Sequence, residues 1–263
     1  MNETIKIPES VKRSETPALP IAGVGHCALS EAFNMDCAEG LRLYPDNYFD
    51  LAIVAPPYGI GASKPTEKPH RVKQKNGQWL TTPKSYYEHK GWDDQAFSYE
   101  QFVEILRVSK DQIIWGCNFF DFQLKGGRII WDKMNGLSDQ HDVEIAYCSI
   151  GYRTDIVRYM WRGMMQGLSA SKEIEKANVQ QGNKSLNEKR IHPTQKPVKL
   201  YDWLLDNYAN ENWKIVDPFL GSGSSRIAAN KAGLDFTGFE LDEEYFKAQE
   251  KRWQNWVSQT RLF

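Results

Sequence analysis

The feature that most constrains the fold is a glycine-containing loop between two short strands near the C-terminus. An apolar strand over 214–216 leads into DPFLGSGS, which starts at Asp217 and continues as a helix of Ser, Ile and Ala residues ending near Gly233. A second strand over 235–239 follows and ends in Glu240. Two strands joined through a helix form a βαβ unit with parallel strands. The sequence therefore predicts an α/β fold, with a mostly parallel twisted sheet covered by helices on both faces.

Further segments continue this alternation of strands and helices. Short apolar runs predict strands, and apolar residues at helical spacing predict helices. The predicted strands are 51–54, 112–115, 128–131 and 143–148, and the predicted helices are 99–108 and 199–208. Residues 1–33 mix charges, prolines and glycines without a sustained period, so we expect an irregular N-terminal arm followed by one domain over 34–263.

Composition excludes several classes of protein. A hydrophobic content of 41% over 263 residues is enough for a sizeable core. The chain has no apolar run long enough to span a bilayer, and its N-terminal segment lacks the apolar centre of a signal peptide, which predicts a soluble cytoplasmic protein. The cysteines have neither CxxC pairing nor metal-type spacing with the five histidines; they are Cys27, Cys37, Cys117 and Cys148. We therefore expect no disulfide and no metal site.

The charges are distributed unevenly along the chain. Residues 61–92 carry seven Lys or Arg against two Glu (+5), and residues 151–190 carry eight against four acids (+4). Because the net charge is −1, the remainder sums to −10. Two basic insertions on an acidic body are typical of a phosphate-binding face, although charged loops are often only solvated surface.

The glycine loop suggests a cofactor site. Gly221 and Gly223 would let the backbone approach a ligand closely, and Glu240 at the end of the next strand could accept hydrogen bonds from ribose hydroxyls. Gly-x-Gly alone is weak evidence, because many strand-to-helix turns need glycine only for positive φ.

Three longer motifs resemble the DNA amino-methyltransferases that use S-adenosylmethionine. DPFLGSGS followed by GFELDEEYF resembles their cofactor half, HPTQKP matches a segment before the cofactor strand, and NMDCAEGL resembles an element that meets the cofactor adenine. The resemblance implies a Rossmann-like methyltransferase fold. The cofactor-binding residues that it implies are Asp36, Thr194, Lys196, Asp217, Phe219, Gly221, Gly223, Ser224 and Glu240. Without it, Asp36 would be a helix N-cap and HPTQKP a proline-bounded turn.

The family carries Asp-Pro-Pro-Tyr, or Ser-Pro-Pro-Tyr in many cytosine-N4 enzymes, at the end of a strand. Here the catalytic motif reads Ala55, Pro56, Pro57 and Tyr58. The exocyclic amine of adenine is a poor nucleophile, and a carboxylate that accepts its hydrogens directs its lone pair toward the sulfonium methyl. Tyr58 would stack on a base flipped out of the duplex. Because Ala55 lacks an acceptor, we expect an inactive or nearly inactive enzyme, and the intact neighbourhood favours an introduced change over a naturally inactive protein.

The catalytic motif precedes the cofactor half, an order that resembles the β class of these enzymes, with target recognition between them. The DNA-binding residues that we expect in the two insertions are Lys64, Arg71, Lys73, Lys75, Arg153, Arg158, Arg162, Lys184, Lys189 and Arg190. Most of them would contact phosphate rather than bases. The expected partner is double-stranded DNA in a bacterial or phage setting, and a homodimer is a weaker expectation.

Alternatives remain for the substrate. A small residue before Pro-Pro-Tyr is compatible with cytosine-N4 methylation, whereas HPTQKP and DPFLGSG are more similar to adenine-type members, so adenine N6 is our preferred target. A non-catalytic DNA-binding protein with the same fold is a different class that Ala55 would permit. RNA or protein substrates are also compatible with a Pro-Pro-Tyr element.

Overall fold

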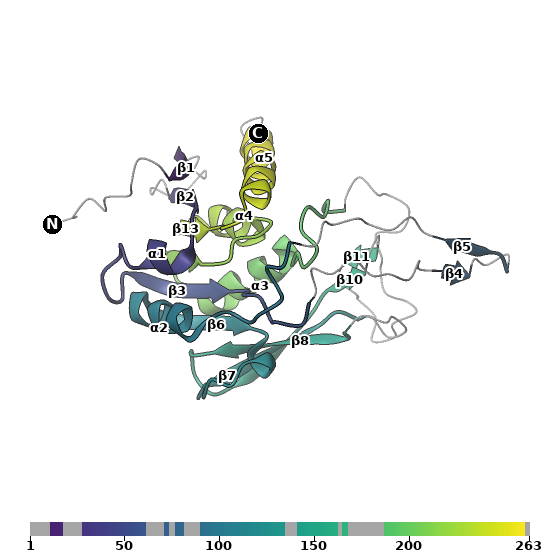
Figure 1. The fold of residues 1–263 in the computed structure, drawn as a ribbon, viewed down its shortest axis with the longest axis horizontal. Coiled ribbons are helices and arrows are strands. Elements are labelled where there is room, and N and C mark those ends of the chain that lie inside the picture. The colour runs from purple at the N-terminus through teal and green to yellow at the C-terminus, as the bar shows by residue number, and fades with distance from the viewer. Residues whose placement is uncertain are drawn as a thin grey trace.

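The computed structural model describes residues 11–17, 28–61, 71–73, 77–81, 90–134, 141–162, 165–167 and 187–260. In this part of the chain, nine strands form one sheet in the order β1-β2-β13-β12-β3-β6-β8-β7-β9 (Figure 1). Their bounds are β1 Lys12–Pro17, β2 Leu29–Asn34, β3 Phe49–Val54, β6 Ser109–Trp115, β7 Gly127–Asp132, β8 Val143–Cys148, β9 Thr154–Arg158, β12 Lys214–Asp217 and β13 Asp235–Phe239.

Helices and two small strand pairs complete the described structure. The helices are α1 Cys37–Leu41, α2 Tyr99–Val108, α3 Val198–Tyr208, α4 Ser224–Lys231 and α5 Glu243–Thr260, with a 3-10 turn η1 at Cys117–Phe119. The strand pairs are β4 Arg71–Lys73 with β5 Trp79–Thr81, and β10 Met160–Arg162 with β11 Met165–Gly167. Figure 1 shows β4 and β5 well away from the main sheet.

The centre of the sheet is parallel, as predicted. Strands β2, β13, β12, β3 and β6 pair in parallel, whereas β8 runs antiparallel to both β6 and β7, and β1 runs antiparallel to β2. The unit β12-α4-β13 is the βαβ unit that the glycine loop indicated. The α/β fold class is therefore confirmed.

Alternate side chains of the central strands pack into two separate hydrophobic cores. Leu51 and Ile53 of β3 pack with α3 and α4 on one face, whereas Ala52 and Val54 pack with α1 and α2 on the other. Strands buried on both faces read as continuous apolar runs, which is why the predicted strands lacked a polar alternation. Helices on both faces of a mostly parallel sheet agree with the expected architecture.

The predicted bounds of helices and strands agree closely with the observed ones where local sequence determines where an element begins and ends. Helix α2 has the predicted bounds, because Ser98 accepts a hydrogen bond from Gln101 N and the Gln101 side chain bonds back to Ser98 N. This capping box fixes the first turn of the helix. Strands β8 and β13 also begin and end where the sequence indicated.

The irregular arm expected over 1–33 is wrong for two stretches. Residues 12–17 form β1 and residues 29–34 form β2, so the expected boundary at residue 33 cuts through a strand of the main sheet. Ala32 and Phe33 are fully buried, because β2 is covered on both faces and pairs with β13. Its sequence carries no strand signal because the polar Ser30 and Glu31 interrupt the apolar run, although Ser30 is buried and accepts a hydrogen bond from Arg226.

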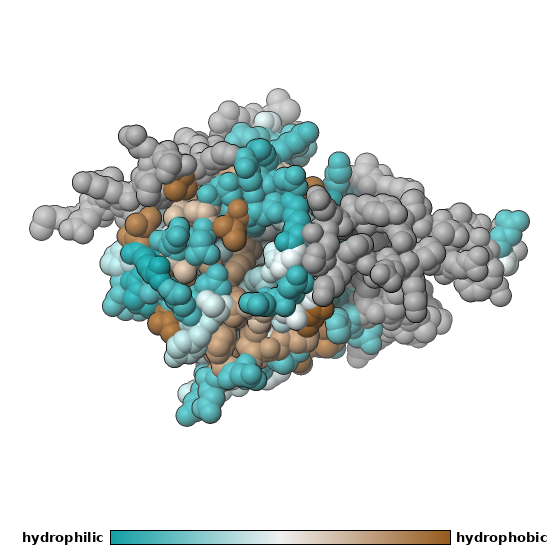
Figure 2. Space-filling model, viewed as in Figure 1, coloured by the Kyte–Doolittle hydropathy of each residue, from teal (hydrophilic) through white to brown (hydrophobic). Residues whose placement is uncertain are grey.

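The surface of the described chain has both hydrophilic and hydrophobic regions. Figure 2 shows a hydrophilic surface over α5 and more hydrophobic surface lower on the same face, near β6 and β8. Among the described residues, no helix is long and apolar enough to cross a membrane.

Candidate functional site

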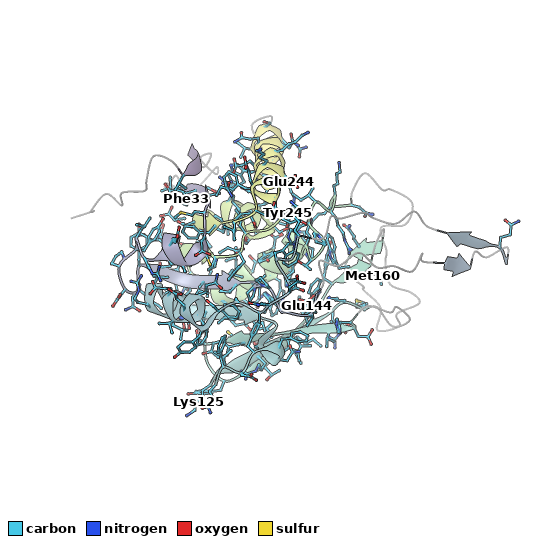
Figure 3. All side chains as sticks on the ribbon, viewed as in Figure 1. Phe33, Lys125, Glu144, Met160, Glu244 and Tyr245 are labelled. Atoms are coloured by element: carbon cyan, nitrogen blue, oxygen red, sulfur yellow. The ribbon has the colours of Figure 1, made fainter. Side chains whose placement is uncertain are left out.

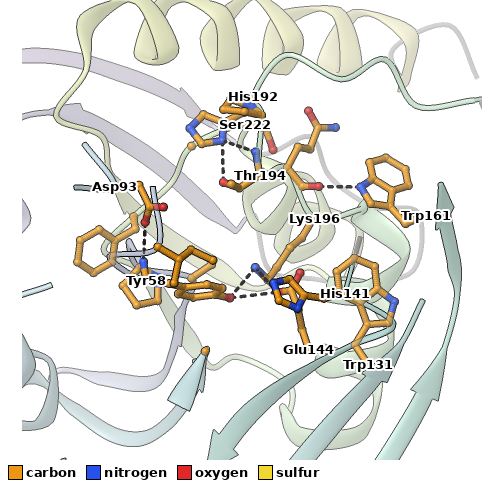
Figure 4. A pocket seen from close by; sticks show the side chains of 18 of the residues that line it. Tyr58, Asp93, Trp131, His141, Glu144, Trp161, His192, Thr194, Lys196 and Ser222 are labelled. Carbon is orange, nitrogen blue, oxygen red and sulfur yellow. Dashed lines mark hydrogen bonds and ion pairs between the residues drawn. The ribbon is translucent and has the colours of Figure 1, made fainter. Parts of the chain in front are cut away.

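A cavity of about 440 Å³ opens at the carboxyl ends of β3, β6 and β12. Cavities of this size accommodate small molecules, and this edge of a parallel sheet is where α/β proteins bind them. Its lining comes from the ends of these strands, from β8 and from the segment 190–196. Figure 4 shows Tyr58, Lys196 and Glu144 together at one end, and His192, Thr194 and Ser222 at the other.

The glycine-loop end is shaped by backbone. Gly221 has φ +51° and Gly223 has φ +72°, conformations that residues with a Cβ rarely adopt. Gly221 N donates to Glu240 Oε2 at 2.8 Å, and Leu220 N donates to Phe239 O at 2.8 Å. The loop is thus tied to the end of β13, and its backbone faces the cavity.

Two carboxylates order this loop, Asp217, which is buried, and Glu240, which is half-buried. Asp217 accepts from Phe219 N at 3.0 Å and from Ser225 Oγ at 2.5 Å. Burial raises the pKa of Asp217 to about 6 and that of Glu240 to about 7, although hydrogen bonds from the loop act in the opposite direction. Both carboxyl groups thus hold the glycine loop in place from outside the cavity lining.

His192 closes the same end of the cavity. Its ring lies 4.2 Å from the ring of Tyr245 and 5.1 Å from that of Trp92. Burial, with the nearby charge of Lys196, lowers the pKa of His192 to about 3, so the ring is neutral at pH 7. Thr194 Oγ1 lies 3.1 Å from His192 Nδ1. A neutral ring next to the glycine loop provides a flat, largely apolar wall.

The turn after β3 is held by a second segment of the chain. Asp93 Oδ1 accepts from Tyr58 N at 2.8 Å and from Gly59 N at 3.0 Å, and Phe97 N donates to Pro57 O. Ala55 lies at the cavity and presents only a methyl group to it. The backbone of the turn is therefore fixed independently of the side chain at position 55.

The side chain of Tyr58 is fixed as well. Its hydroxyl donates to Glu144 Oε2 at 3.0 Å and accepts from Lys196 Nζ at 3.0 Å. Its ring stacks on Phe119, with centroids 5.2 Å apart and an 18° angle between the planes. A Cβ on Gly116 would collide with the ring. The lining therefore limits both the position and the tilt of the ring.

Glu144 is the charged residue at this end that the motifs did not indicate. It pairs with Lys196 at 2.9 Å and with Lys133 at 2.5 Å. Burial alone would raise the pKa of Glu144, but the two ammonium groups lower it to about 2. Figure 3 shows Glu144 near the middle of the molecule, below Tyr245 of α5. A permanently ionised carboxylate thus lies beside Tyr58.

The cavity brings together only part of the residue set expected from the sequence. Those that line it are Ala55, Pro56, Tyr58, Thr194, Lys196, Phe219 and Gly221. Asp217, Ser224 and Glu240 instead bond within or behind the glycine loop. Asp36 caps α1 by accepting from Ala38 N and Glu39 N, which is the role that local sequence alone suggested.

The expected DNA-binding residues fall into three groups. Lys64, Lys75 and Lys184 lie outside the described residues, and for Arg71, Lys73 and Arg162 only the backbone is described. Among the others, Arg158 pairs with Asp132 at the cavity end of β9, whereas Arg153 precedes the opposite end of this strand. Lys189 is exposed. Arg190 lines the cavity, with its guanidinium 4.6 Å from the ring centroid of Trp161.

Sequence reasoning missed Glu144, Lys133 and Asp93. Glu144 carries a weak signal, because an acidic residue inside an apolar strand is normally paired when it is buried. Lys133 and Asp93 carry none, since nothing in the local sequence marks their partners and only the fold brings them together. Asp93 is 35 residues from Tyr58, and Glu144 is 86 residues from it.

Space for a ligand at the glycine-loop end depends on the absence of a side chain at Gly221. A Cβ on Gly221 would occupy the space in front of the His192 ring, at 3.8 Å from its nearest atom, so glycine keeps this space open. The loop supplies bare backbone, and Glu240 supplies a carboxylate directly behind it. Among the described residues, no group of three or more His, Cys, Asp or Glu could hold a metal ion.

Comparisons with known proteins point to one family. Residues 113–251 match the N6/N4-type family model described as DNA methylase. The chain is 26% identical over 224 residues to YubD of Escherichia coli (strain K12), which is named as a methylase. This match covers 85% of this chain and 90% of YubD. It is 25% identical over 243 residues to Type II methyltransferase M.HpaI of Haemophilus parainfluenzae, covering 81% and 71%. The crystal structure of an M1.HpyAVI-SAM complex is 18% identical, with a TM-score of 0.49 over 84% of this chain and 98% of that one.

Proposed function

Because this chain belongs to the N6/N4 DNA methylase family, we propose that its target is adenine, which it methylates at N6 in a base flipped out of double-stranded DNA. The methyl donor of a DNA methylase of this type is S-adenosylmethionine. The residues that would hold the donor are the glycine loop with Gly221, the carboxylate of Glu240 behind it, and the wall formed by His192 and Thr194. Asp36 stays a predicted contact of the adenine end of the cofactor.

A single observation carries the proposal: one cavity joins the glycine loop to the Ala-Pro-Pro-Tyr turn. Methyl transfer to an amine is a direct displacement, so the nucleophile and the methyl group must meet in line within one enclosed space. The amine nitrogen forms a bond to the methyl carbon, the sulfur–carbon bond breaks, and the nitrogen then loses a proton. No covalent intermediate on the protein is needed.

The second half of the cavity suits a flipped base. Tyr58, Phe119, Trp131 and Trp161 all line it. Aromatic side chains stack on bases and help offset the cost of extruding a base from the duplex. The basic residues of the two insertions are the proposed phosphate contacts, and dimerisation stays a prediction.

Ala55 is the reason to expect impaired catalysis. The position faces the cavity beside Pro56 and Tyr58, but its methyl group accepts no hydrogen bond from the amine. Loss of one well-placed electrostatic group costs on the order of a hundred- to a thousand-fold in rate. Because the turn is held through backbone contacts with Asp93, its geometry does not depend on an acidic side chain at position 55. We propose an enzyme that retains its binding sites and lacks most of its rate.

The choice of adenine rests on the motifs HPTQKP and DPFLGSG, which are more similar to adenine-type members. The family model covers both N6 and N4 enzymes, so cytosine N4 is the second candidate.

The test compares methyl transfer by the chain and by Ala55→Asp. Tritium-labelled S-adenosylmethionine is incubated with unmethylated DNA, and the labelled nucleoside is identified by chromatography. We expect N6-methyladenine, formed roughly a hundred- to a thousand-fold faster by Ala55→Asp. Ala55→Val, which adds bulk without an acceptor, is the matched control and should stay slow.

Other outcomes separate the alternatives. Labelled N4-methylcytosine would replace the adenine assignment. Absence of label from both proteins, with DNA binding intact, would favour a non-catalytic DNA-binding protein. Equal rates for the chain and its Ala55→Asp variant would contradict the impairment but leave the enzyme class intact.

A further inference from the structure

The carboxylate of Glu144 lies at the base end of the cavity and is not part of any motif that suggested the function. It projects from β8, whose first residues extend beyond the end of β6, where Trp115 pairs with Ala146. Within hydrogen-bond distance of its two oxygens lie Lys133 Nζ, Lys196 Nζ and the hydroxyl of Tyr58. The side chain of Lys196 is only 5% exposed, so this network is largely shielded from water.

The chemistry of these groups fixes the direction of each hydrogen bond. An ammonium group has donors only, so Lys196 donates to the hydroxyl oxygen of Tyr58. The hydroxyl has one proton, which must then point at Glu144, an ionised carboxylate that only accepts. Charge-assisted bonds of this kind are about twice as strong as neutral ones. The hydroxyl of Tyr58 therefore has one favoured orientation.

Tyr58 is thereby held at both ends. Asp93 binds its backbone N–H, and Glu144 with Lys196 binds its hydroxyl. Between them, Gly116 leaves room for the ring. Stacking on a flipped base is productive only if the platform has a defined position, because an error of about 1 Å in a reacting pair can cost about a hundredfold in rate.

We propose that Glu144 is a positioning residue, which fixes the ring of Tyr58 through its hydroxyl, together with Lys196, so that a flipped base stacks in reach of the methyl donor. This inference rests on the proposed function, since it assigns Tyr58 to the target base. Glu144 acts through Tyr58 and need not touch the base.

Glu144→Gln removes the negative charge and leaves two ammonium groups beside Tyr58. In the native protein, burial and the charge of Glu144 hold the pKa of Tyr58 well above its usual value. The other titratable groups that face this hydroxyl are Tyr201 and Cys117, which act in the same direction, and the ammonium of Lys196. Once Glu144 is neutral, Lys196 favours the tyrosinate, so the pKa of Tyr58 should fall.

The first measurement follows Tyr58 directly and needs no catalysis. A single 3-fluorotyrosine is incorporated at position 58 and titrated by fluorine NMR in the full-length chain. We expect its pKa to fall in Glu144→Gln. The matched control is Glu104→Gln on α2, whose ion-paired side chain is 16% exposed against 17% for Glu144 and does not line the cavity. It should leave the titration unchanged.

The second measurement uses methyl transfer in the Ala55→Asp background. Loss of a charge-assisted hydrogen bond predicts a ~10- to 100-fold lower kcat for Glu144→Gln, with an unchanged KM for S-adenosylmethionine. Tyr58→Phe removes only the hydroxyl, leaves Glu144 paired with both lysines, and should lose a similar factor. The double variant should be no slower than the slower single variant, because both remove the same contact.

The outcomes are distinguishable from a failure of the proposed function. Full kcat in Tyr58→Phe, or losses that multiply in the double variant, would overturn the inference. If no variant methylates DNA, the proposed function fails, and with it the role of Tyr58 as a platform for the base. The fluorine titration then still shows whether Glu144 controls the hydroxyl of Tyr58. A fallen pKa at position 58 supports control by Glu144, and an unchanged pKa overturns it.

Discussion

The two ends of the cavity are held in place by different means. At the glycine-loop end, the contacts come from residues 217–252: Asp217 and Glu240 bind loop N–H groups, and Arg252 binds Ser222 O. At the Tyr58 end, the contacts come from Asp93, Glu144 and Lys196, which lie up to 138 residues away. One end is local in sequence and depends on backbone, whereas the other is assembled by the fold from side chains.

This difference has a consequence for how each end responds to change. Backbone conformation at the loop is set by glycines and by two carboxyl groups, Asp217 and Glu240, whose pKa values are raised by burial. The opposite end is an ionised network whose charges compensate each other across separate elements. The cofactor end should therefore respond to pH, and the base end to the loss of any one partner.

The largest predicted change is a loss of folding stability in Gly116→Ala, at the base end of the cavity. Gly116 has φ +73°, and a Cβ there would overlap the Tyr58 ring. A left-handed conformation combined with overpacking predicts a loss of about 2 to 5 kcal/mol in the free energy of unfolding. Chemical denaturation would measure it, with Gly77→Ala as the control, where φ is also positive but no atom lies within 4 Å of the added Cβ. Equal losses in both variants would show that backbone strain alone is responsible.

The sequence predicted the cofactor end better than the base end, for the same physical reason. The glycine loop, β13 and Glu240 are contiguous, so one motif contains both the βαβ unit and the proposed ligand-binding groups. The match to the DNA methylase family model confirms the resemblance that these segments carry. Tyr58 was found because its motif is local, but its partners Glu144 and Asp93 have no sequence signature. Strand β2 was missed because the polar residues Ser30 and Glu31 interrupt its apolar run although both are buried.

A smaller effect is expected at the cofactor end for Asp217→Ala. The change leaves the N–H of Phe219 and the hydroxyl of Ser225 without their acceptor, which predicts roughly 10- to 100-fold weaker binding of S-adenosylhomocysteine. Isothermal titration calorimetry would measure it. Asp50→Ala is the control, because Asp50 accepts from Lys214 N at the opposite end of β12. Unchanged affinity in Asp217→Ala would mean that the glycines alone define the loop.

The pH dependence of ligand affinity at the cofactor end should be a smaller effect than the loss of affinity in Asp217→Ala. Burial raises the pKa of Glu240 to about 7, so the group is mostly protonated at pH 6. Ribose hydroxyls that donate to the carboxylate favour its ionised form and lower this pKa in the complex, so that binding releases a proton. Affinity for S-adenosylhomocysteine should then rise by up to about tenfold per unit below pH 7 and level off above it.

The raised pKa of Glu240 also makes the stability of the unliganded protein depend on pH. In the absence of ligand, the raised pKa of Glu240 stabilises the fold below its ordinary value of 4.5, and this contribution is lost as pH rises through about 7. Ligand affinity and unliganded stability should therefore change in opposite directions across this window. Glu240→Gln should flatten the affinity profile and reduce the slope of the stability profile, in which Asp217, with a pKa raised to about 6, still contributes. A pH-dependent affinity that persists in this variant would assign the effect to another group.

The smallest effect concerns DNA binding at the surface around the base end, where Arg158 at one end of β9 and Arg153 just before its other end form a matched pair. Arg158 pairs with Asp132 next to the cavity residue Lys133, and Arg153 pairs with Asp155 near the opposite end of β9. If DNA reaches the cavity over this edge, Arg158→Gln should weaken DNA binding a few-fold and reduce the salt slope by about 1, as for one lost phosphate contact. Arg153→Gln should leave both unchanged. Fluorescence anisotropy with duplex DNA over a salt series would measure the slopes, and a larger loss for Arg153 would mean that DNA approaches the sheet from the other end.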